Sequence, residues 1–515
     1  MAEYDAYKYN ESDLLMTGTR WAYPEEIMES GKKIELLDEN GNITERVAHA
    51  GLPLISDGKT VYVDDSDAHS LIIGSTGSKK TRLFCMPTLD IMRRAGESVV
   101  VTDPKGELYA LTAAAFENSG YKVAVLNLRE PRKSNGWNIL RLARDYYDSG
   151  DIERAVSIVD DLSHTLFPDT GKKVDPFWNQ TSRSMLRGLA MLMVEGGELI
   201  TKDEVNLHML RMLSVYFDTD MSTSTLDLMK CYPESSSAAV NLKSVLRGSE
   251  NTFNNIRVSF DAGVQMLYVQ PALIRMLSTT EIDFSELGKR KTVLYIIMPD
   301  EKTTLHGIVS MAIKQCYEQL IATAQQYESC SLPVRVNFLL DEFGNLPNIP
   351  DISSMISAAR SRNIRFFLII QGLYQLAARY GAETAHTIKG NCANWVFLTS
   401  RELELLEEIS TLCGVNGASG ERLITVSQLQ RLKKERGEVL MLIGRRYPFI
   451  SCLPDISQYP LPACPPRPYP SFTGSDIPQT TLDELLERAK KLFPDKFPTI
   501  DSDDFDFTIK GLGSI

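Results

Sequence analysis

The sequence contains no apolar run long enough to cross a bilayer. Its longest apolar runs, at residues 293–298 and 366–370, have the length of strands, whereas a membrane-spanning helix needs about 20 such residues. The opening residues Met1-Ala-Glu-Tyr-Asp also lack the basic and then apolar order of a signal peptide. The sequence therefore predicts a soluble chain without transmembrane helices.

Cysteine and histidine are sparse and scattered. The eight cysteines include no C-x-x-C pair, and the six histidines show no spacing that suits a metal site. This pattern argues against a zinc centre and against a disulfide framework, and a reducing cytosol fits it best.

Basic charge is not in excess either, because 55 Lys and Arg face 67 Asp and Glu, giving a net charge of −12. That balance argues against a protein that coats nucleic acid over its whole surface, but it allows DNA held in a channel. The 515 residues, 43% of them hydrophobic and 24% charged, form an ordinary globular composition with room for two to four domains.

Strand and helix patterns alternate in two separate stretches of the chain. β-branched apolar runs occur at residues 71–73, 98–102 and 122–126, and return at 292–297, 334–340, 365–370, 394–398 and 438–443. Between the two stretches, residues 152–166, 181–194, 204–216 and 253–266 show helical spacing. Because strands that alternate with helices form parallel sheets covered on both faces, the fold class is predicted as α/β with an all-α domain inserted.

Four parts are expected along the chain. Residues 1–70 form a polar segment with short β signals that packs on the main domain, residues 71–165 and 285–460 form that discontinuous α/β domain, and residues 166–284 form the all-α insertion. Residues 461–515 contain a proline-rich linker, a short helix with a Thr481/Glu484 capping box, and a flexible acidic tail. Residues 471–515 carry nine acidic and five basic side chains, so a solvated terminus and a docking peptide are equal alternatives.

A phosphate-binding loop follows the first of these strands. Gly74-Ser-Thr-Gly-Ser-Lys-Lys-Thr81 is close to the pattern G-x-x-x-x-G-K-[ST], in which backbone N–H groups wrap the phosphates at a helix N-terminus. Lys80 is expected to reach the β- and γ-phosphate oxygens, and the Thr81 hydroxyl to ligate Mg²⁺. The predicted nucleotide-binding residues are Gly74, Ser75, Thr76, Gly77, Ser78, Lys79, Lys80, Thr81 and Arg82.

The loop departs from the pattern at one position, where Lys79 replaces the second glycine. Glycine there lets the backbone approach the phosphate without a Cβ atom, so a lysine can distort the cradle. A side chain that points to solvent is the tolerated alternative. A chance Gly/Ser turn is the competing interpretation of the whole loop.

Two later strands supply the remaining groups of a nucleoside triphosphatase. Residues 336–340 form an apolar strand that ends in Asp341 and Glu342, which predicts Mg²⁺ held by Asp341 and an attacking water polarised by Glu342. The next strand ends in Gln371, which is placed to sense the γ-phosphate. Both halves of one site rarely occur together by chance, so we expect a P-loop NTPase of RecA-like organisation.

At this point the sequence resembles the type IV secretion coupling proteins, the VirD4/TraG family of conjugative DNA-transfer ATPases. The resemblance extends from about Thr19 to Pro448 and rests on several motifs besides the P-loop. These are Asp103-Pro-Lys-Gly-Glu107, Asp175-Pro-Phe-Trp-Asn179, Leu340-Asp-Glu-Phe-Gly-Asn-Leu-Pro347, Ala358-Ala-Arg-Ser-Arg362, Ile369-Ile-Gln-Gly-Leu-Tyr-Gln-Leu376 and Leu423-Ile-Thr-Val-Ser-Gln-Leu429.

The resemblance implies a homo-hexameric ring, monomeric in isolation or assembled at a membrane, with ATP and Mg²⁺ bound between neighbouring subunits. It places Arg360 as the arginine that acts on the next protomer's phosphates, with Arg362 as the alternative and a surface role for either as the plain one. It implies an ATPase and DNA translocase that recruits single-stranded DNA with its relaxase, or protein effectors, to secretion-channel or membrane-anchor proteins. The expected location is the bacterial cytoplasm or the cytoplasmic face of the membrane.

Three departures from the family keep a second hypothesis open. Members usually begin with membrane-spanning helices, and residues 179–270 hold only eight basic against ten acidic side chains, although DNA binding requires a basic surface. The third departure is Lys79, which leaves nucleotide binding plausible and hydrolysis in question. The alternative function is therefore a nucleotide-gated substrate receptor or scaffold with weak or no ATPase activity.

Overall fold

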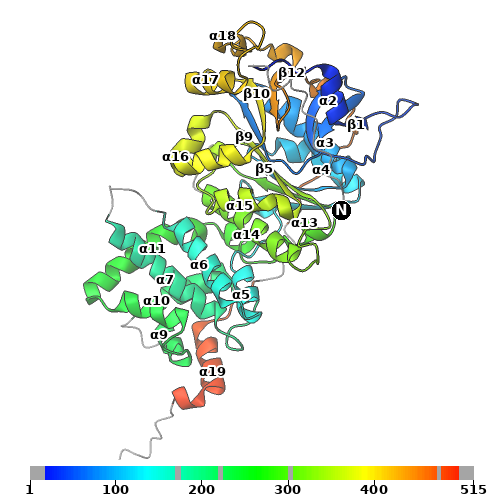
Figure 1. The fold of residues 1–515 in the computed structure, drawn as a ribbon. Coiled ribbons are helices and arrows are strands. Elements are labelled where there is room, and N and C mark those ends of the chain that lie inside the picture. Colours follow the sequence, from blue (N-terminus) through cyan, green and yellow to red (C-terminus); the bar gives the residue numbers. More distant parts are fainter. Residues whose placement is uncertain (1–17, 169–174, 219–223, 300–304, 472–476, 498–515) are drawn as a thin grey trace, which may run out of the picture. The chain divides into compact units, whose positions relative to one another are not determined.

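The computed structural model describes residues 18–168, 175–218, 224–299, 305–471 and 477–497 (Figure 1). The chain divides into two compact units, residues 1–135 with 281–473 and residues 136–280 with 474–515. Among the described residues, none of the helices combines the length and the apolar character that a membrane span requires.

The first unit is built on a nine-stranded sheet with the order β12-β11-β10-β4-β9-β8-β5-β7-β6. The strands from β10 to β6 in this order run parallel, whereas β11 and β12 are antiparallel. Each of the eight predicted strand runs falls on one of these strands. They are β4 (Ser70–Gly74), β5 (Ser98–Asp103), β6 (Lys122–Asn127), β7 (Thr292–Ile297), β8 (Val336–Leu340), β9 (Ile364–Ile370), β10 (Asn394–Thr399), β11 (Glu438–Ile443) and β12 (Phe449–Cys452).

Helices cover both faces of this sheet because its central strands are apolar on both sides. On one face, α3 (Met86–Ala95) and α4 (Glu107–Asn118) pack on alternate strand residues such as Val99, Val101 and Tyr295 (Figure 1). On the other face, Tyr317 of α14 (His306–Ala324) meets the ring of Phe366 and donates a hydrogen bond to Met355 O of α15 (Ile352–Ala359). The remaining helices of this unit are α13 (Glu286–Lys289), α16 (Leu373–Asn391), α17 (Leu403–Leu412) and α18 (Val426–Leu429).

The N-terminal segment packs on the main sheet's unit. It contains α2 (Pro24–Ser30) and a three-stranded antiparallel sheet in the order β1-β3-β2. The strands are β1 (Lys32–Glu35), β2 (Leu52–Ser56) and β3 (Thr60–Asp64), and their buried side chains join the same apolar core as α3.

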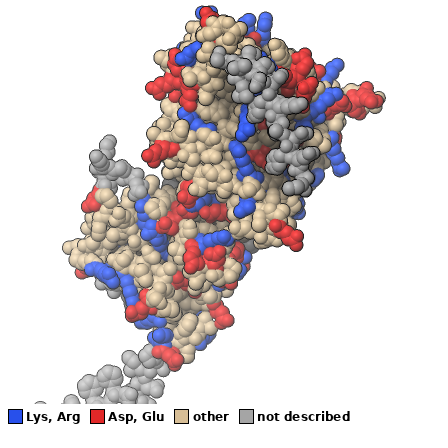
Figure 2. Space-filling model, viewed as in Figure 1, with Lys and Arg blue, Asp and Glu red and all other residues tan. Residues whose placement is uncertain are grey.

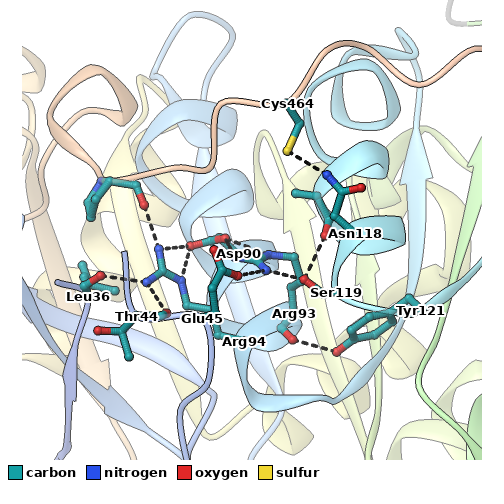
Figure 3. A network of polar contacts seen from close by, with 12 residues as sticks. Leu36, Thr44, Glu45, Asp90, Arg93, Arg94, Asn118, Ser119, Tyr121 and Cys464 are labelled. Atoms are coloured by element: carbon teal, nitrogen blue, oxygen red, sulfur yellow. Dashed lines mark hydrogen bonds and ion pairs between the residues drawn. The ribbon is translucent and has the colours of Figure 1, made fainter. Parts of the chain in front are cut away.

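Two adjacent arginines of α3 fasten this segment and the later proline-rich linker (Figure 3). Arg93 and Arg94 share the carboxylate of Asp90, all three being at most 4% exposed. Arg93 also pairs with Glu45, and Arg94 donates to the carbonyls of Leu36, Thr44 and Pro460. Because buried guanidinium groups need partners for their N–H groups, these bonds fix three distant segments against one helix.

The second unit is all helical. Its helices are α5 (Arg141–Asp148), α6 (Ile152–Leu166), α7 (Pro176–Val194), α8 (Leu207–Val215), α9 (Thr225–Leu228), α10 (Ser237–Leu246), α11 (Glu250–Tyr268), α12 (Pro271–Met276) and α19 (Leu482–Leu492). The unit begins at Gly136 rather than at the expected residue 166, because the apolar face of α6 packs on α5 and α7.

The segment after Pro460 divides between the two units. Residues 461–471 lie on the sheet unit, where the ring of Tyr469 stacks on Tyr109 with centroids 4.5 Å apart. Helix α19, which begins at the predicted capping box of Thr481 and Glu484, instead buries Leu482, Leu485, Leu486 and Ala489 in the helical unit. The predicted linker and tail are therefore packed as far as residue 497, and the last 18 residues of the predicted acidic tail lie outside the described residues.

A buried ion pair anchors α19. Glu204 is 5% exposed and accepts hydrogen bonds from Arg488, Thr480 and Thr201. Burial alone would raise the pKa of Glu204, but these donors lower it to about 2. The pair therefore stabilises α19 above about pH 4.5, and this contribution is lost as the pH falls towards 2.

We predict that Arg488→Met weakens the docking of α19 by about 1–3 kcal/mol at pH 7, because it leaves a buried carboxylate without its cation. Hydrogen exchange of the amides of residues 482–492 measures this docking, and the difference between parent and variant should shrink at pH 3. Lys490→Met is the control, since Lys490 pairs only with the exposed Glu487. Equal protection of α19 in parent and Arg488→Met would contradict this assignment.

Candidate active site

The phosphate-binding loop begins where the central strand β4 ends. β4 is fully buried between β10 and β9, and Gly74 closes it at the carboxyl edge of the sheet. A Cβ atom on Gly74 would lie 2.5 Å from Ser78 Oγ, so the loop closes tightly only around a glycine. Ser78 N donates to Ser75 O at 3.1 Å, and Gly77 takes a φ of +78°. This curled loop leads into a π-helical turn, η1 (Thr81–Cys85), which continues as α3.

Lys79 adopts the backbone conformation for which glycine is ordinarily needed. Its φ is +66°, in the left-handed region that costs a residue with a Cβ atom about 1–2 kcal/mol. The side chain is directed to Asp455, whose Oδ2 lies 3.4 Å from Lys79 Nζ. The lysine thus keeps the glycine-like curl of the loop, and its ammonium is held by a partner outside the loop.

Lys80, Thr81 and Arg82 follow at the start of the helical turn. Lys80 is 8% exposed, and its Nζ donates to Gly74 O at 2.6 Å, back across the loop. Arg82 is half exposed and its Nε donates to Asp455 Oδ2 at 3.1 Å. Asp455 is a residue of this site that no sequence motif singled out.

The paired carboxylates stand at the end of β8, two strands from β4 in the sheet order. Thr102 Oγ1 donates to Asp341 O at 2.8 Å, and Glu342 N donates to Asp341 Oδ1 at 3.0 Å. Burial, and then the charge of Glu342, raise the pKa of Asp341 to about 6, although Lys80 opposes this. Glu342 has a φ of +54°, a strained conformation of the kind that concentrates at functional sites.

A chain of polar contacts joins these carboxylates to the phosphate loop. Gln371, at the end of β9, donates from Nε2 to Glu342 Oε2 at 2.9 Å. Thr76 Oγ1 of the loop donates to Gln371 Oε1 at 3.3 Å. Asn345 Nδ2 also donates to Glu342 Oε2, at 2.9 Å. The structure therefore brings the predicted residues 74–82, Asp341, Glu342 and Gln371 to one edge of the sheet, and adds Asn345, which the sequence did not indicate.

A cavity of about 610 Å³ opens beside the loop. Glu402, on its wall, accepts the backbone N–H groups of Leu373 and Tyr374 at 3.1 Å each and so caps the first turn of α16. The lining residues are Ser75, Thr76, Gly77, Ser78, Gln371, Tyr374, Thr399, Ser400, Arg401, Glu402 and Lys434.

Arg360 lies away from this edge. It begins a 3₁₀ turn, η7 (Arg360–Arg362), that directly precedes β9, and its guanidinium donates to Asn391 O at 2.8 Å. Because β9 runs parallel to β4, the residues before β9 stand at the opposite edge of the sheet from the phosphate loop. The structure therefore does not bring Arg360 to the loop of its own chain. Arg362, the alternative, donates to Cys330 O at 3.3 Å in the same turn.

Asp103 of the Asp-Pro-Lys-Gly-Glu motif has a structural role. Its Oδ2 accepts the N–H of Tyr109 at 2.8 Å and so holds the first turn of α4. Burial raises the pKa of this carboxyl group.

A family model described as "Type IV secretory system Conjugative DNA transfer" matches residues 25–435. The chain belongs to this family. Conjugal transfer protein TraG of Escherichia coli is 26% identical over 463 residues, which cover 80% of this chain and 66% of TraG. Protein VirD4 of Rhizobium radiobacter is 24% identical over 357 residues, which cover 67% of this chain and 48% of VirD4. This conjugative-transfer chain thus spans just under two thirds of TraG and about half of VirD4.

Solved structures of the plasmid coupling protein TrwB share the fold. The complex with the non-hydrolysable ATP analogue ADPNP has a TM-score of 0.62 at 15% identity, covering 89% of this chain and 97% of TrwB. The complex with ADP and Mg²⁺ has a TM-score of 0.58 with the same identity and coverage. The predicted α/β fold with a RecA-like nucleotide-binding domain and a helical domain is therefore confirmed.

We predict that Asp341→Asn stabilises the nucleotide-free protein while it weakens binding of magnesium nucleotide. A pKa raised from 3.8 to about 6 means that the native state favours the protonated carboxyl, so its stabilising effect is lost as the pH rises through 6. The asparagine variant should therefore be about 1–3 kcal/mol more stable than the parent at pH 8, and equally stable near pH 4. Urea unfolding at the two pH values measures this, and a destabilised variant at pH 8 would contradict it.

Proposed function

We propose that this chain is a coupling-protein ATPase, which binds ATP and Mg²⁺ at the phosphate loop and uses them to drive or gate conjugative transfer. The observation that carries this proposal is the joining of Thr76, Gln371 and Glu342 by hydrogen bonds at the carboxyl edge of the sheet. TrwB, which shares the fold, has been solved with ADPNP and with ADP and Mg²⁺, and this supports the choice of ligands.

The residues of the loop supply the binding contacts. The backbone N–H groups of residues 75–80 are available to wrap the phosphates, and Lys80 would move from Gly74 O to a phosphate oxygen. Thr81 offers a hydroxyl oxygen and Asp341 a carboxylate, both of them the oxygen donors that Mg²⁺ prefers. The residues present therefore fit the cation, which would neutralise charge on the transferring phosphoryl group.

Glu342 is held for the role of polarising water. Asn345 and Gln371 both donate to its Oε2, and neither bond uses Oε1. Oε1 can therefore accept a proton from an attacking water while the carboxylate stays fixed. Through Gln371 the same chain of contacts reaches Thr76, so the loop that holds the nucleotide and the base that attacks it are coupled.

Arg360 would complete the site from a neighbouring subunit. It stands at the edge of the sheet opposite its own loop, so it can serve only the loop of another copy. This placement supports a homo-hexameric ring in which each site uses two chains, and ring closure would depend on local concentration at a membrane or on substrate.

Relaxase-bound single-stranded DNA, or protein effectors, are the proposed substrates, passed to secretion-channel or membrane-anchor proteins at the cytoplasmic face of a bacterial membrane. The family to which the chain belongs supports this choice. On the drawn face of the helical unit, acidic and basic side chains are interspersed (Figure 2). That surface suits contacts with protein at least as well as it suits nucleic acid.

A nucleotide-gated receptor with weak or no hydrolysis is the second candidate. The observation that favours it is the left-handed backbone of Lys79, since a strained residue at the phosphate can misplace the loop for chemistry while still allowing binding.

We predict that Glu342→Gln retains ATP binding and loses hydrolysis, and that Arg360→Ala also loses hydrolysis. A one-to-one mixture of these two inactive proteins should recover activity, because about a quarter of the sites in mixed rings would combine an intact Glu342 with an intact Arg360 from the next subunit. Steady-state phosphate release measures both effects.

Arg362→Ala is the matched control for this experiment, and its hydrolysis should stay close to that of the parent. Recovery in mixtures with Arg362→Ala but not with Arg360→Ala would transfer the role to Arg362. A Glu342→Gln protein that hydrolyses ATP normally would contradict the role of Glu342.

A further inference from the structure

Two cationic side chains of the phosphate loop converge on one carboxylate from a distant part of the chain. Lys79 Nζ lies 3.4 Å from Asp455 Oδ2, and Arg82 Nε donates to the same oxygen at 3.1 Å. Arg82 Nη2 pairs with Asp455 Oδ1 as well. The side chain of Asp455 is 18% exposed, whereas those of its two partners are 32% and 50% exposed.

The fold delivers Asp455 to this place independently of the loop. β11 is antiparallel to β10, and β12 is antiparallel to β11, so β12 ends at the same carboxyl edge as β4 and β10. Asp455 follows three residues after β12 and caps a 3₁₀ turn, where its Oδ1 accepts the N–H and the Oγ of Ser457 at 3.1 and 3.0 Å. The carboxylate is therefore fixed by its own turn before either cation reaches it.

The carboxylate is also charged at every pH at which the protein is studied. The hydrogen bonds from Arg82, together with those from Ser457, hold the pKa of Asp455 far below its usual range. A permanent anion thus faces the side chain of the one residue that departs from the phosphate-loop pattern.

We propose that Asp455 is a positioning residue that allows a lysine to occupy position 79 of the phosphate loop. By pairing with the ammonium, it keeps the long side chain out of the space over the loop and favours the left-handed backbone that glycine would adopt without a partner. The inference rests on the proposed function, because it takes the loop to be the nucleotide site.

Two roles of Asp455 have to be separated. Its stronger contact is the paired bond to Arg82, which ties the turn after β12 to the helix behind the loop and would matter whatever residue stood at 79. Its contact with Lys79 matters only while that lysine is present. The two roles differ in whether the effect of removing the charge depends on position 79, which a double-mutant cycle measures.

The experiment measures the affinity of a fluorescent ATP analogue, with Mg²⁺, for four full-length proteins. These are the parent chain, Asp455→Asn, Lys79→Gly and the double variant. Asparagine keeps the capping contact and removes only the charge, so the turn should survive. We expect Asp455→Asn to weaken binding about fivefold in the parent and by less than about 1.5-fold in the Lys79→Gly background, because glycine needs no partner at a positive φ.

Further variants keep the result interpretable. Asp455→Glu should restore most of the affinity lost in Asp455→Asn, and the fivefold loss should shrink in high salt, which screens the pair. Asp203→Asn removes an exposed carboxylate on the helical unit, whose side chain is 81% exposed, and is the control that should leave affinity unchanged. Circular dichroism of each variant checks that it is folded, and Lys79→Gln replaces Asp455→Asn in the comparison if the latter unfolds.

The outcomes separate this inference from the function on which it rests. An equal loss in both backgrounds, or no loss in either, would overturn the positioning role while leaving the nucleotide site in place. No binding by any of the four proteins would overturn the nucleotide site, and the inference with it.

Discussion

The shared edge of the parallel sheet is the constraint on which the site depends. Parallel strands end on the same side, so the loop after β4, the carboxylates after β8 and Gln371 after β9 meet although 290 residues separate Gly77 from Phe367 in the next strand's interior. Open α/β sheets bind ligands at this edge for the same reason. Arg360 stands at the other end of β9, and the same geometry that assembles the site within one chain excludes Arg360 from it. A complete catalytic set therefore calls for a second copy of the chain.

Buried charges hold the surroundings of that sheet. At its amino edge, Arg365 is 1% exposed and bonds to Glu97, Asn337 and the carbonyls of Ala50 and Ser66, so β9, β8 and the N-terminal segment are fastened together. The cluster of Asp90, Arg93 and Arg94 does the same for α3, the helix that begins at the phosphate loop. Both clusters leave few unpaired N–H groups, which is the condition under which buried charge is tolerated. Strain at Lys79 and Glu342 is thus placed on a frame that is otherwise well paired.

Much of this arrangement was predictable from the sequence, because it depends on local patterns. The β-branched runs marked the strands, and Asp341, Glu342 and Gln371 were recognisable as residues at strand ends. Periodicity cannot say which unit a helix packs on, so α6 and α19 were assigned to the wrong neighbours or to a free tail. Nor does any local pattern mark Asp455 or Asn345, since their roles come from contacts made across the fold. The left-handed backbone at Lys79 likewise required the structure.

The measurement that tests the central claim most directly is steady-state ATP hydrolysis by this chain beside its Lys79→Gly variant, each with and without single-stranded DNA. If the loop retains its working curl with a lysine at 79, the parent should turn over ATP, DNA should accelerate it, and the two proteins should agree within about threefold. A parent that binds ATP without turnover, and whose hydrolysis is restored by Lys79→Gly, would contradict this and identify a nucleotide-gated receptor whose transport is powered by another ATPase.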